Sequence, residues 1–230
     1  DTWERMRQEQ AKTLPIVKDD ELVGVVSTGD IAKSYMNVYD SEILAKAETP
    51  YRNILEVLEG SMVVGNPDDC VTSGKVLIGA AKPEMMENFV EEGDIVIVGD
   101  RYEAQLCAIE MKAKCVVVCT GANVAKTITR MAEQRGCAII QTKYDTFIAS
   151  RLINQSMPID FFMRKEGFVT FTTEDFLDDI KSVMAEKRHR DFPILDKDGH
   201  YIGMISRRNL LNVKKKDIIL VDHNEVDQAV

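Results

Sequence analysis

The sequence predicts an α/β protein in which two copies of an α+β unit flank an inserted α/β domain. Two observations support this fold class. The stretch LPIVKDDELVGVVSTGD at residues 14–30 returns as FPILDKDGHYIGMISRRN at residues 192–209. Between the copies, short apolar runs alternate with helical patterns, as expected for a mostly parallel sheet covered by helices. A chain of 230 residues is long enough for two domains.

The composition predicts a globular, cytoplasmic protein. With 45% hydrophobic and 29% charged residues, the chain should form packed cores. No apolar run approaches the ~20 residues needed to cross a bilayer, and the first ten residues are too polar for a signal peptide. The five cysteines form no CxxC pair, which indicates reduced core thiols and argues against a zinc site. A net charge of −9 argues against a nucleic-acid partner, so an anionic ligand would need a local basic patch.

The first copy reads as a helix, a hairpin and a second helix. Residues 3–11 have a helical pattern, and residues 14–19 and 22–27 are β-rich runs joined by a tight polar turn. Helical spacing at Ile31 and Tyr35 follows the second run. We therefore expect a hairpin that leads into a helix.

The second copy repeats this order at residues 192–197, 201–206 and 207–213. The matched positions are Pro15 with Pro193, Gly24 with Gly203, Ser27 with Ser206, and Asp30 with Asn209. A helix is expected over residues 172–190, with a threonine as N-cap and an apolar face of Phe176, Ile180, Val183 and Met184. A strand at residues 167–172 precedes it. The first copy has no counterpart of this strand, so we expect a segment upstream of residue 1 to complete that unit.

The segment between the copies predicts a separate α/β domain. After a helix at residues 49–60, strands alternate with helices along the chain. The expected strands are 75–80, 94–100, 114–120 and 137–142, and the expected helices are 83–92, 101–113, 122–136 and 145–155. The simplest architecture places the two distant copies side by side, with this domain inserted between them.

The duplicated unit, with its LPIV strand, hhGhhS strand and SxxD helix, resembles the CBS domain, a regulatory repeat that works in pairs. The central stretch VGDRYEAQLCAIEMKAKCVVVCTGA resembles a DRTGG domain and keeps Asp100 and Arg101 of the motif that names it. A CBS pair interrupted by a DRTGG domain resembles the regulatory insertion of certain bacterial family II inorganic pyrophosphatases. On this resemblance, we expect the chain to be a regulatory region that is not catalytic by itself.

This resemblance divides the chain into four parts. Residues 1–60 would hold the first CBS repeat and a linker helix, and residues 61–160 the DRTGG-like domain. Residues 161–221 would hold the second CBS repeat. Residues 222–230 would begin a DHH-type catalytic domain that continues past the end of this sequence.

The terminal stretch DIILVDHNEVDQAV reads as a strand at residues 218–221 whose end delivers Asp222 and His223. A carboxylate and an imidazole at a strand end suit a manganese or magnesium site. A polar tail explains the same residues. LVDHNE is similar to the DHH-type motif of family II pyrophosphatases, which implies that Asp222 and His223 bind manganese in a longer protein.

The resemblance to paired CBS repeats also implies an adenine-nucleotide site between the copies. Ser27 and Ser206 each precede a helix, where free backbone N–H groups and the helix dipole favour a phosphate. Asp30 and Asn209 lie one turn further on, within reach of ribose hydroxyls. The same SxxD spacing is also that of a helix capping box, which both copies need.

Local charge and one aromatic residue strengthen the ligand interpretation at the second copy. Residues 207–216, RRNLLNVKKK, hold five basic residues and no acid, which favours phosphate binding over a merely solvated helix face. Tyr201 precedes Gly203 by two positions, so its ring could stack on adenine or be an ordinary strand aromatic. Resemblance favours stacking, because a tyrosine recurs there in this pyrophosphatase subfamily. The first copy has Leu22 and Val23, so we expect one good site per chain.

The predicted ligands are AMP, ADP, ATP and diadenosine tetraphosphate, acting as regulators on a homodimer. The predicted nucleotide-binding residues are Ser27, Thr28, Asp30, Tyr201, Ile202, Gly203, Ser206, Arg207, Arg208 and Asn209. Two alternatives remain open from the sequence. One is a CBS scaffold that dimerises another protein, and the other is an independent α/β enzyme.

Overall fold

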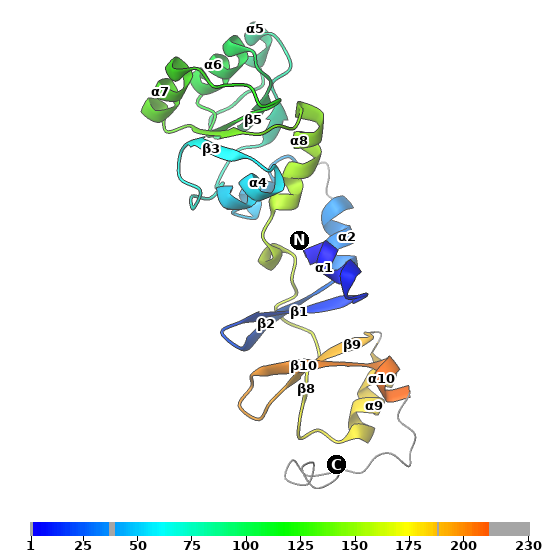
Figure 1. Ribbon diagram of the computed structural model, residues 1–230. Coiled ribbons are helices and arrows are strands. Elements are labelled where there is room, and N and C mark those ends of the chain that lie inside the picture. The colour runs from blue at the N-terminus through cyan, green and yellow to red at the C-terminus, as the bar shows by residue number, and fades with distance from the viewer. Residues whose placement is uncertain (1, 37–39, 188, 212–230) are drawn as a thin grey trace. The chain divides into compact units, whose positions relative to one another are not determined.

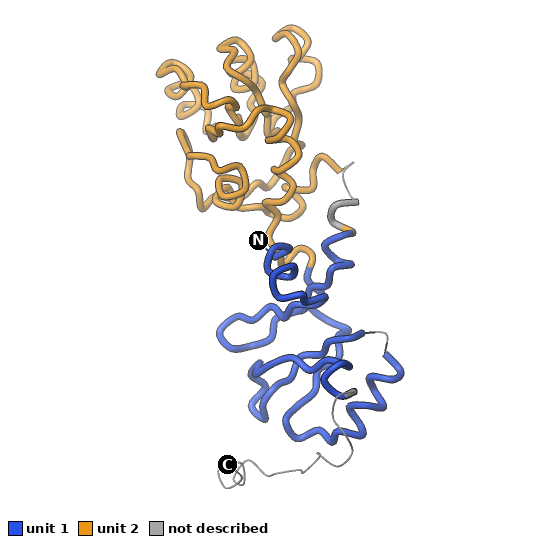
Figure 2. The backbone as a smooth tube through the Cα atoms, turned by 45° about the vertical axis from the view of Figure 1, so that its right-hand side comes forward, with its two compact units in different colours: residues 1–32, 163–230 blue, residues 33–162 orange. Residues whose placement is uncertain are grey.

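The structure, a computed structural model, describes residues 2–36, 40–187 and 189–211 and divides into two compact units. The paired-repeat unit comprises residues 1–32 and 163–230, and the inserted unit comprises residues 33–162 (Figure 2). Both copies of the repeat therefore belong to one unit. The predicted strand at residues 218–221 and the two predicted metal ligands, Asp222 and His223, lie outside the described residues.

The first copy forms the expected helix, hairpin and helix. Helix α1 (Thr2–Gln8) precedes strands β1 (Thr13–Lys18) and β2 (Glu21–Ser27), and α2 (Thr28–Met36) follows them (Figure 1). The two strands pair antiparallel. Asp19 and Asp20 connect them with φ values of 51° and 65°, which is the conformation of a tight primed turn that matches strand twist.

The second copy adds a third strand to the same plan. Its elements are β8 (Phe171–Thr172), α9 (Leu177–Glu186), β9 (Asp191–Leu195), β10 (Tyr201–Ser206) and α10 (Arg207–Leu211). The sheet order is β10-β9-β8, with β8 parallel to β9.

The expected threonine N-cap is wrong. Helix α9 begins only after Phe176, which caps it without a side-chain hydrogen bond. Thr172 instead belongs to a turn, because its N–H donates to the Asp175 carboxylate at 2.7 Å and its hydroxyl accepts from the N–H of Glu174. Phe176 is consequently 67% exposed rather than part of the buried face. Ile180 and Met184 do line that face, as expected.

The core of the second copy is small and aromatic. Phe171 and Phe192 lie with ring centroids 5.3 Å apart and pack with Ile180 and Met184. Such aromatic pairs favour offset or edge arrangements over stacked faces, which accords with their tilt of 49°. This cluster fixes β9 against α9.

The inserted unit contains a five-stranded sheet of order β3-β7-β6-β5-β4. The four strands predicted from sequence are parallel neighbours: β4 (Val76–Ile78), β5 (Ile95–Val98), β6 (Cys115–Val118) and β7 (Ala138–Gln141). The edge strand β3 (Ser61–Val64) pairs antiparallel with β7 and was not predicted. A strand of four residues is too short for alternating apolar and polar residues to distinguish it from a loop.

Helices cover both faces of this sheet. Because β4 to β7 follow one another in one direction, right-handed crossovers bring α5 (Pro83–Met86), α6 (Tyr102–Glu110) and α7 (Lys126–Arg135) to the same face (Figure 1). The other face packs against α3 (Ile43–Lys46), α4 (Tyr51–Val57), α8 (Thr146–Leu152) and the 3₁₀ turn at Ile153–Ser156, and a second 3₁₀ turn spans Ile159–Phe161. Among the described helices, none is long and apolar enough to cross a membrane.

We predict that only one of the five thiols reacts in the native protein. Cys70 is exposed, whereas Cys107, Cys115, Cys119 and Cys137 are buried. Burial raises the pKa of Cys119 to about 11 and that of Cys137 to about 12, so these thiols stay protonated at pH 8.

Titration with Ellman's reagent at pH 8 should therefore label one thiol rapidly in native protein and all five after unfolding in guanidinium. Rapid labelling of two or more thiols in the native protein would show that the core of the inserted unit opens.

Candidate functional site

In the first copy, Ser27 and Asp30 form a reciprocal helix cap. The Ser27 hydroxyl donates to Asp30 Oδ2 at 2.6 Å, and the Asp30 N–H donates back to Ser27 Oγ at 3.3 Å. The Ser27 N–H also donates to the Asp30 carboxylate at 2.8 Å. The N–H of Thr28 is engaged as well, because it donates to the carbonyl of Lys12. The capping role accounts for the three contacts between Ser27 and Asp30.

The second copy makes a similar but more open cap. The Ser206 hydroxyl hydrogen-bonds to Asn209 Oδ1, and the Asn209 N–H donates to Ser206 Oγ at 3.3 Å. Asn209 is exposed, whereas Asp30 is partly buried. An amide carries no charge, so this copy offers a phosphate less repulsion than the first copy does.

Both hairpins contain the same bulge. In the first copy, Ile16 pairs with Gly24 and Val17 pairs with Leu22, which leaves Val23 between them. In the second copy, Ile194 pairs with Gly203 and Leu195 pairs with Tyr201, which leaves Ile202 between them. A bulge of this kind re-aims the neighbouring side chains. Structure therefore supports the match of Leu22 with Tyr201 and of Val23 with Ile202.

The two glycines after the bulges have different surroundings. A Cβ atom on Gly24 would lie 2.9 Å from the carbonyl oxygen of Arg164 and 2.9 Å from the Met163 sulfur. A Cβ atom on Gly203 would meet no atom within 4 Å. Beside Gly203 the strand is open on one side, whereas the chain itself covers the strand beside Gly24.

Tyr201 and Ile202 lie where the two hairpin turns meet. The N–H of Tyr201 donates to the carbonyl of Asp20 at 2.9 Å, and Glu21 forms a β-bridge with His200. The Tyr201 side chain is half-buried, and burial raises the pKa of its phenol. Ile202 is 52% exposed. An aromatic residue and an exposed apolar residue therefore directly precede the open glycine in β10.

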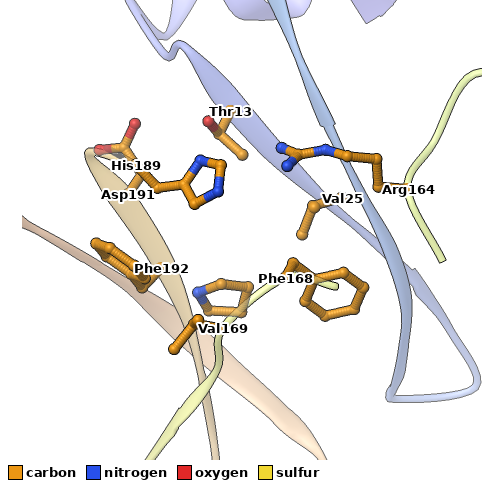
Figure 3. Close-up of a pocket in the computed structure, with 9 residues that line it drawn as sticks. Thr13, Val25, Arg164, Phe168, Val169, His189, Asp191 and Phe192 are labelled. Atoms are coloured by element: carbon orange, nitrogen blue, oxygen red, sulfur yellow. The ribbon is translucent and has the colours of Figure 1, made fainter. Parts of the chain in front are cut away.

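A pocket lies at the opposite ends of the strands, between the two copies (Figure 3). Thr13 faces it from β1, opposite Ser27, and Asp191 faces it from β9, opposite Ser206. Burial raises the pKa of the Asp191 carboxyl group. The full lining is Thr13, Val25, Arg164, Phe168, Val169, His189, Asp191, Phe192 and Pro193.

Sequence reasoning missed Arg164 at this pocket. Its Nε lies 3.5 Å from Asp30 Oδ2, and its backbone exchanges two hydrogen bonds with Val25, at 2.8 and 3.0 Å. No local pattern in MRKEGF marks this arginine, because its partners come from the first copy.

The predicted phosphate-binding arginines differ in their surroundings. The Arg207 guanidinium donates to the carbonyls of Met184 and Lys187 at the end of α9. Arg208 is exposed. The basic residues at 214–216 lie outside the described residues. Arg207 thus has a structural role at α9 whatever else it binds.

Arg101 of the DRTGG-like motif also has a structural role. Its guanidinium donates to the carbonyls of Ala80 and Ala81 at 2.9 and 3.0 Å, and it approaches that of Gly79 at 3.4 Å. These contacts hold the loop after β4 beside the start of α6.

Comparison with known families agrees with this architecture. Residues 1–37 and 159–216 match the CBS domain, and residues 53–156 match the DRTGG domain. The fold and the repeats thus define a paired CBS module that contains a DRTGG domain.

Two inorganic pyrophosphatases are similar to nearly the whole of this chain. The chain is 38% identical over 229 residues to the cobalt-dependent inorganic pyrophosphatase of Clostridium perfringens, and 33% identical over 224 residues to the probable manganese-dependent inorganic pyrophosphatase of Thermotoga maritima. These matches cover 99% and 97% of this chain, which spans 42% and 41% of the two relatives.

A solved structure gives the same result. It is the crystal structure of the CBS and DRTGG domains of the regulatory region of Clostridium perfringens pyrophosphatase, complexed with its activator, diadenosine tetraphosphate. The match has a TM-score of 0.84 at 36% identity and covers 90% of both chains. The chain belongs to this family of CBS–DRTGG regulatory regions of inorganic pyrophosphatases.

The two glycines provide a matched test of the paired-repeat unit. We predict that Gly24→Ala lowers the free energy of unfolding by about 1–3 kcal/mol, because the new methyl group would press on backbone at Arg164. Gly203→Ala should change it by no more than about 0.5 kcal/mol. Urea denaturation of both variants measures this, and equal effects would show that residues 163–164 do not cover Gly24.

A second pair of variants tests the role of Arg207. We predict that Arg207→Ala destabilises the fold by about 1–2 kcal/mol, because the last carbonyls of α9 lose a charged donor. Arg208→Ala removes the same charge from an exposed site and should cost less than about 0.5 kcal/mol. Unchanged stability in Arg207→Ala would refute the structural role.

Proposed function

We propose that this chain is the nucleotide-sensing region of an inorganic pyrophosphatase and that adenine nucleotides bound to it control pyrophosphate hydrolysis. One observation carries the proposal. The solved relative holds diadenosine tetraphosphate as an activator and matches 90% of this chain at 36% identity. This degree of similarity favours a shared ligand class.

The second copy is the better half-site for adenosine. Gly203 leaves open space at the strand, and Tyr201 presents an aromatic ring beside it, as base stacking requires. Ser206 and Asn209 lie before and within the first turn of α10, where the ribose and a phosphate would find hydroxyl, amide and N–H groups. In the first copy, the chain covers Gly24 and Arg164 engages Asp30. One nucleoside per chain is therefore expected.

The length of β10 favours an extended ligand. Tyr201 and Ser206 are the first and last residues of this strand, about 16 Å apart at the usual rise per residue. A ligand along this strand would place its base at Tyr201 and its phosphates toward Ser206. ADP and ATP belong to the same ligand class.

We propose a two-fold homodimer in which one diadenosine tetraphosphate joins two sites. An isologous contact would satisfy the helix faces of both chains at once. Binding the second adenosine of one ligand is intramolecular and raises affinity through effective concentration.

The catalytic function belongs to the longer protein in this proposal. The relatives depend on cobalt or manganese, and Asp222 and His223 are the proposed manganese ligands of this chain, although they lie outside the described residues. Five free cysteines support a reducing, cytoplasmic location. Pyrophosphate hydrolysis by this chain alone, with manganese, would instead favour an independent enzyme. A dimer that binds no adenine nucleotide would favour a scaffold.

Calorimetry with AMP, ADP, ATP and diadenosine tetraphosphate tests the proposal directly. We expect micromolar AMP binding, about −8 kcal/mol. Diadenosine tetraphosphate should bind more tightly, at one molecule per dimer. Tyr201→Ala should weaken both by about 1–3 kcal/mol for each adenine that no longer stacks on the ring.

Leu22→Ala is the matched control, because Leu22 occupies the equivalent position in the first copy. It should leave affinity within about twofold of the wild type, because no base is expected to stack there. One dinucleotide per chain, or equal losses in the two variants, would contradict the assignment of the site to the second copy.

A further inference from the structure

Arg164 is fixed to the first copy by its backbone. Its N–H donates to the carbonyl of Val25 at 2.8 Å, and its carbonyl accepts from the N–H of Val25 at 3.0 Å. The absence of a side chain at Gly24 allows this approach. Phe162, two residues earlier, is the last residue of the inserted unit. Arg164 therefore lies in the segment that leads from the inserted unit back into the repeats.

The side chain of Arg164 extends into the pocket between the copies. Figure 3 shows its guanidinium directed towards Thr13 from the opposite edge of the pocket. Its Nε is buried and makes no hydrogen bond, although it lies 3.5 Å from Asp30 Oδ2. A buried donor without a hydrogen bond is costly and is well placed to accept a new partner.

The charges around the pocket point to an anionic ligand group. Among the residues that line the pocket in the described part of the chain, Arg164 carries a permanent positive charge. His189 is the other basic residue of this lining. Asp191 faces the same space, and burial raises the pKa of its carboxyl group, which disfavours its charge. Asp30 is the carboxylate that Arg164 contacts.

We propose that Arg164 binds a phosphate group of the nucleotide, exchanging its ion pair with Asp30 for the phosphate. This inference rests on the proposed function and assigns it a residue. A guanidinium presents paired N–H donors that match phosphate oxygens, so phosphate replaces the carboxylate with better geometry.

The exchange also connects ligand binding to the segment between the two units. Since the Arg164 backbone pairs with Val25, a ligand that orders the side chain also orders residues 163–164. Residues 163–164 directly follow the inserted unit, which ends at Phe162.

The test compares ligands that differ only in their phosphate. Calorimetry on the 230-residue chain measures adenosine, AMP and diadenosine tetraphosphate with wild type, Arg164→Gln and Arg164→Lys. We expect Arg164→Gln to weaken AMP about 10- to 100-fold and adenosine less than about twofold. Arg164→Lys keeps the positive charge but loses the paired N–H donors of the guanidinium. It should give an intermediate loss of affinity for AMP and leave the affinity for adenosine unchanged.

Lys165→Gln is the matched control, because it removes the same charge from the next residue along the chain. It should leave all three affinities unchanged. Hydrogen exchange gives a second readout: AMP should slow exchange at the amides of Val25 and Arg164 in the wild type and not in Arg164→Gln.

The outcomes separate this inference from the proposed function. Absence of nucleotide binding by the wild type refutes the proposed function. Wild-type binding with equal AMP affinity in Arg164→Gln refutes the role of Arg164. Equal losses for adenosine and AMP would show that Arg164 only supports the fold. If Arg164→Gln does not fold, the AMP-to-adenosine ratio of Arg164→Lys decides between these results.

Discussion

The backbone bridge between Val25 and Arg164 is the constraint on which the paired-repeat unit depends. A whole domain separates these residues in sequence, so the chain must return to β2 after leaving it. Closing a long loop costs entropy, although this cost grows slowly with length, and a folded insertion with fixed ends reduces it further. Once residues 163–164 lie against β2, the second copy follows directly and its hairpin turn meets that of the first.

The same bridge makes the two halves of a duplicated sequence unequal. Both hairpins have the same bulge followed by the same glycine. At Gly24 the missing side chain accommodates the chain's own backbone, and at Gly203 it leaves open surface. A repeat that is nearly symmetric in sequence thus forms one strand that the chain covers and one strand that stays open beside its glycine.

The pairs Ser27 with Asp30 and Ser206 with Asn209 show that helix capping and phosphate binding would use the same atoms. Ser27 and Asp30 cap α2 with hydrogen bonds that need no ligand, and Ser206 with Asn209 does likewise at α10. A phosphate at either helix would compete for the serine hydroxyl and the free N–H groups. A phosphate at the start of α2 would meet the negative charge of the partly buried Asp30 carboxylate, whereas a phosphate at the start of α10 would meet the neutral, exposed amide of Asn209.

The sequence by itself determined the elements whose signals are local. Alternating apolar runs gave the four parallel strands, the polar turn gave the first hairpin, and the repeat gave its second copy. The structure alone decided the position of Arg164, the cover over Gly24, the edge strand β3 and the start of α9 at Leu177. The position of Arg164, the cover over Gly24 and the strand β3 each depend on a partner that is distant in sequence. The register of such long-range pairing produces no periodic pattern in the sequence. The start of α9 was missed for a local reason, because Thr172 and Asp175 hydrogen-bond within a turn that competes with the cap.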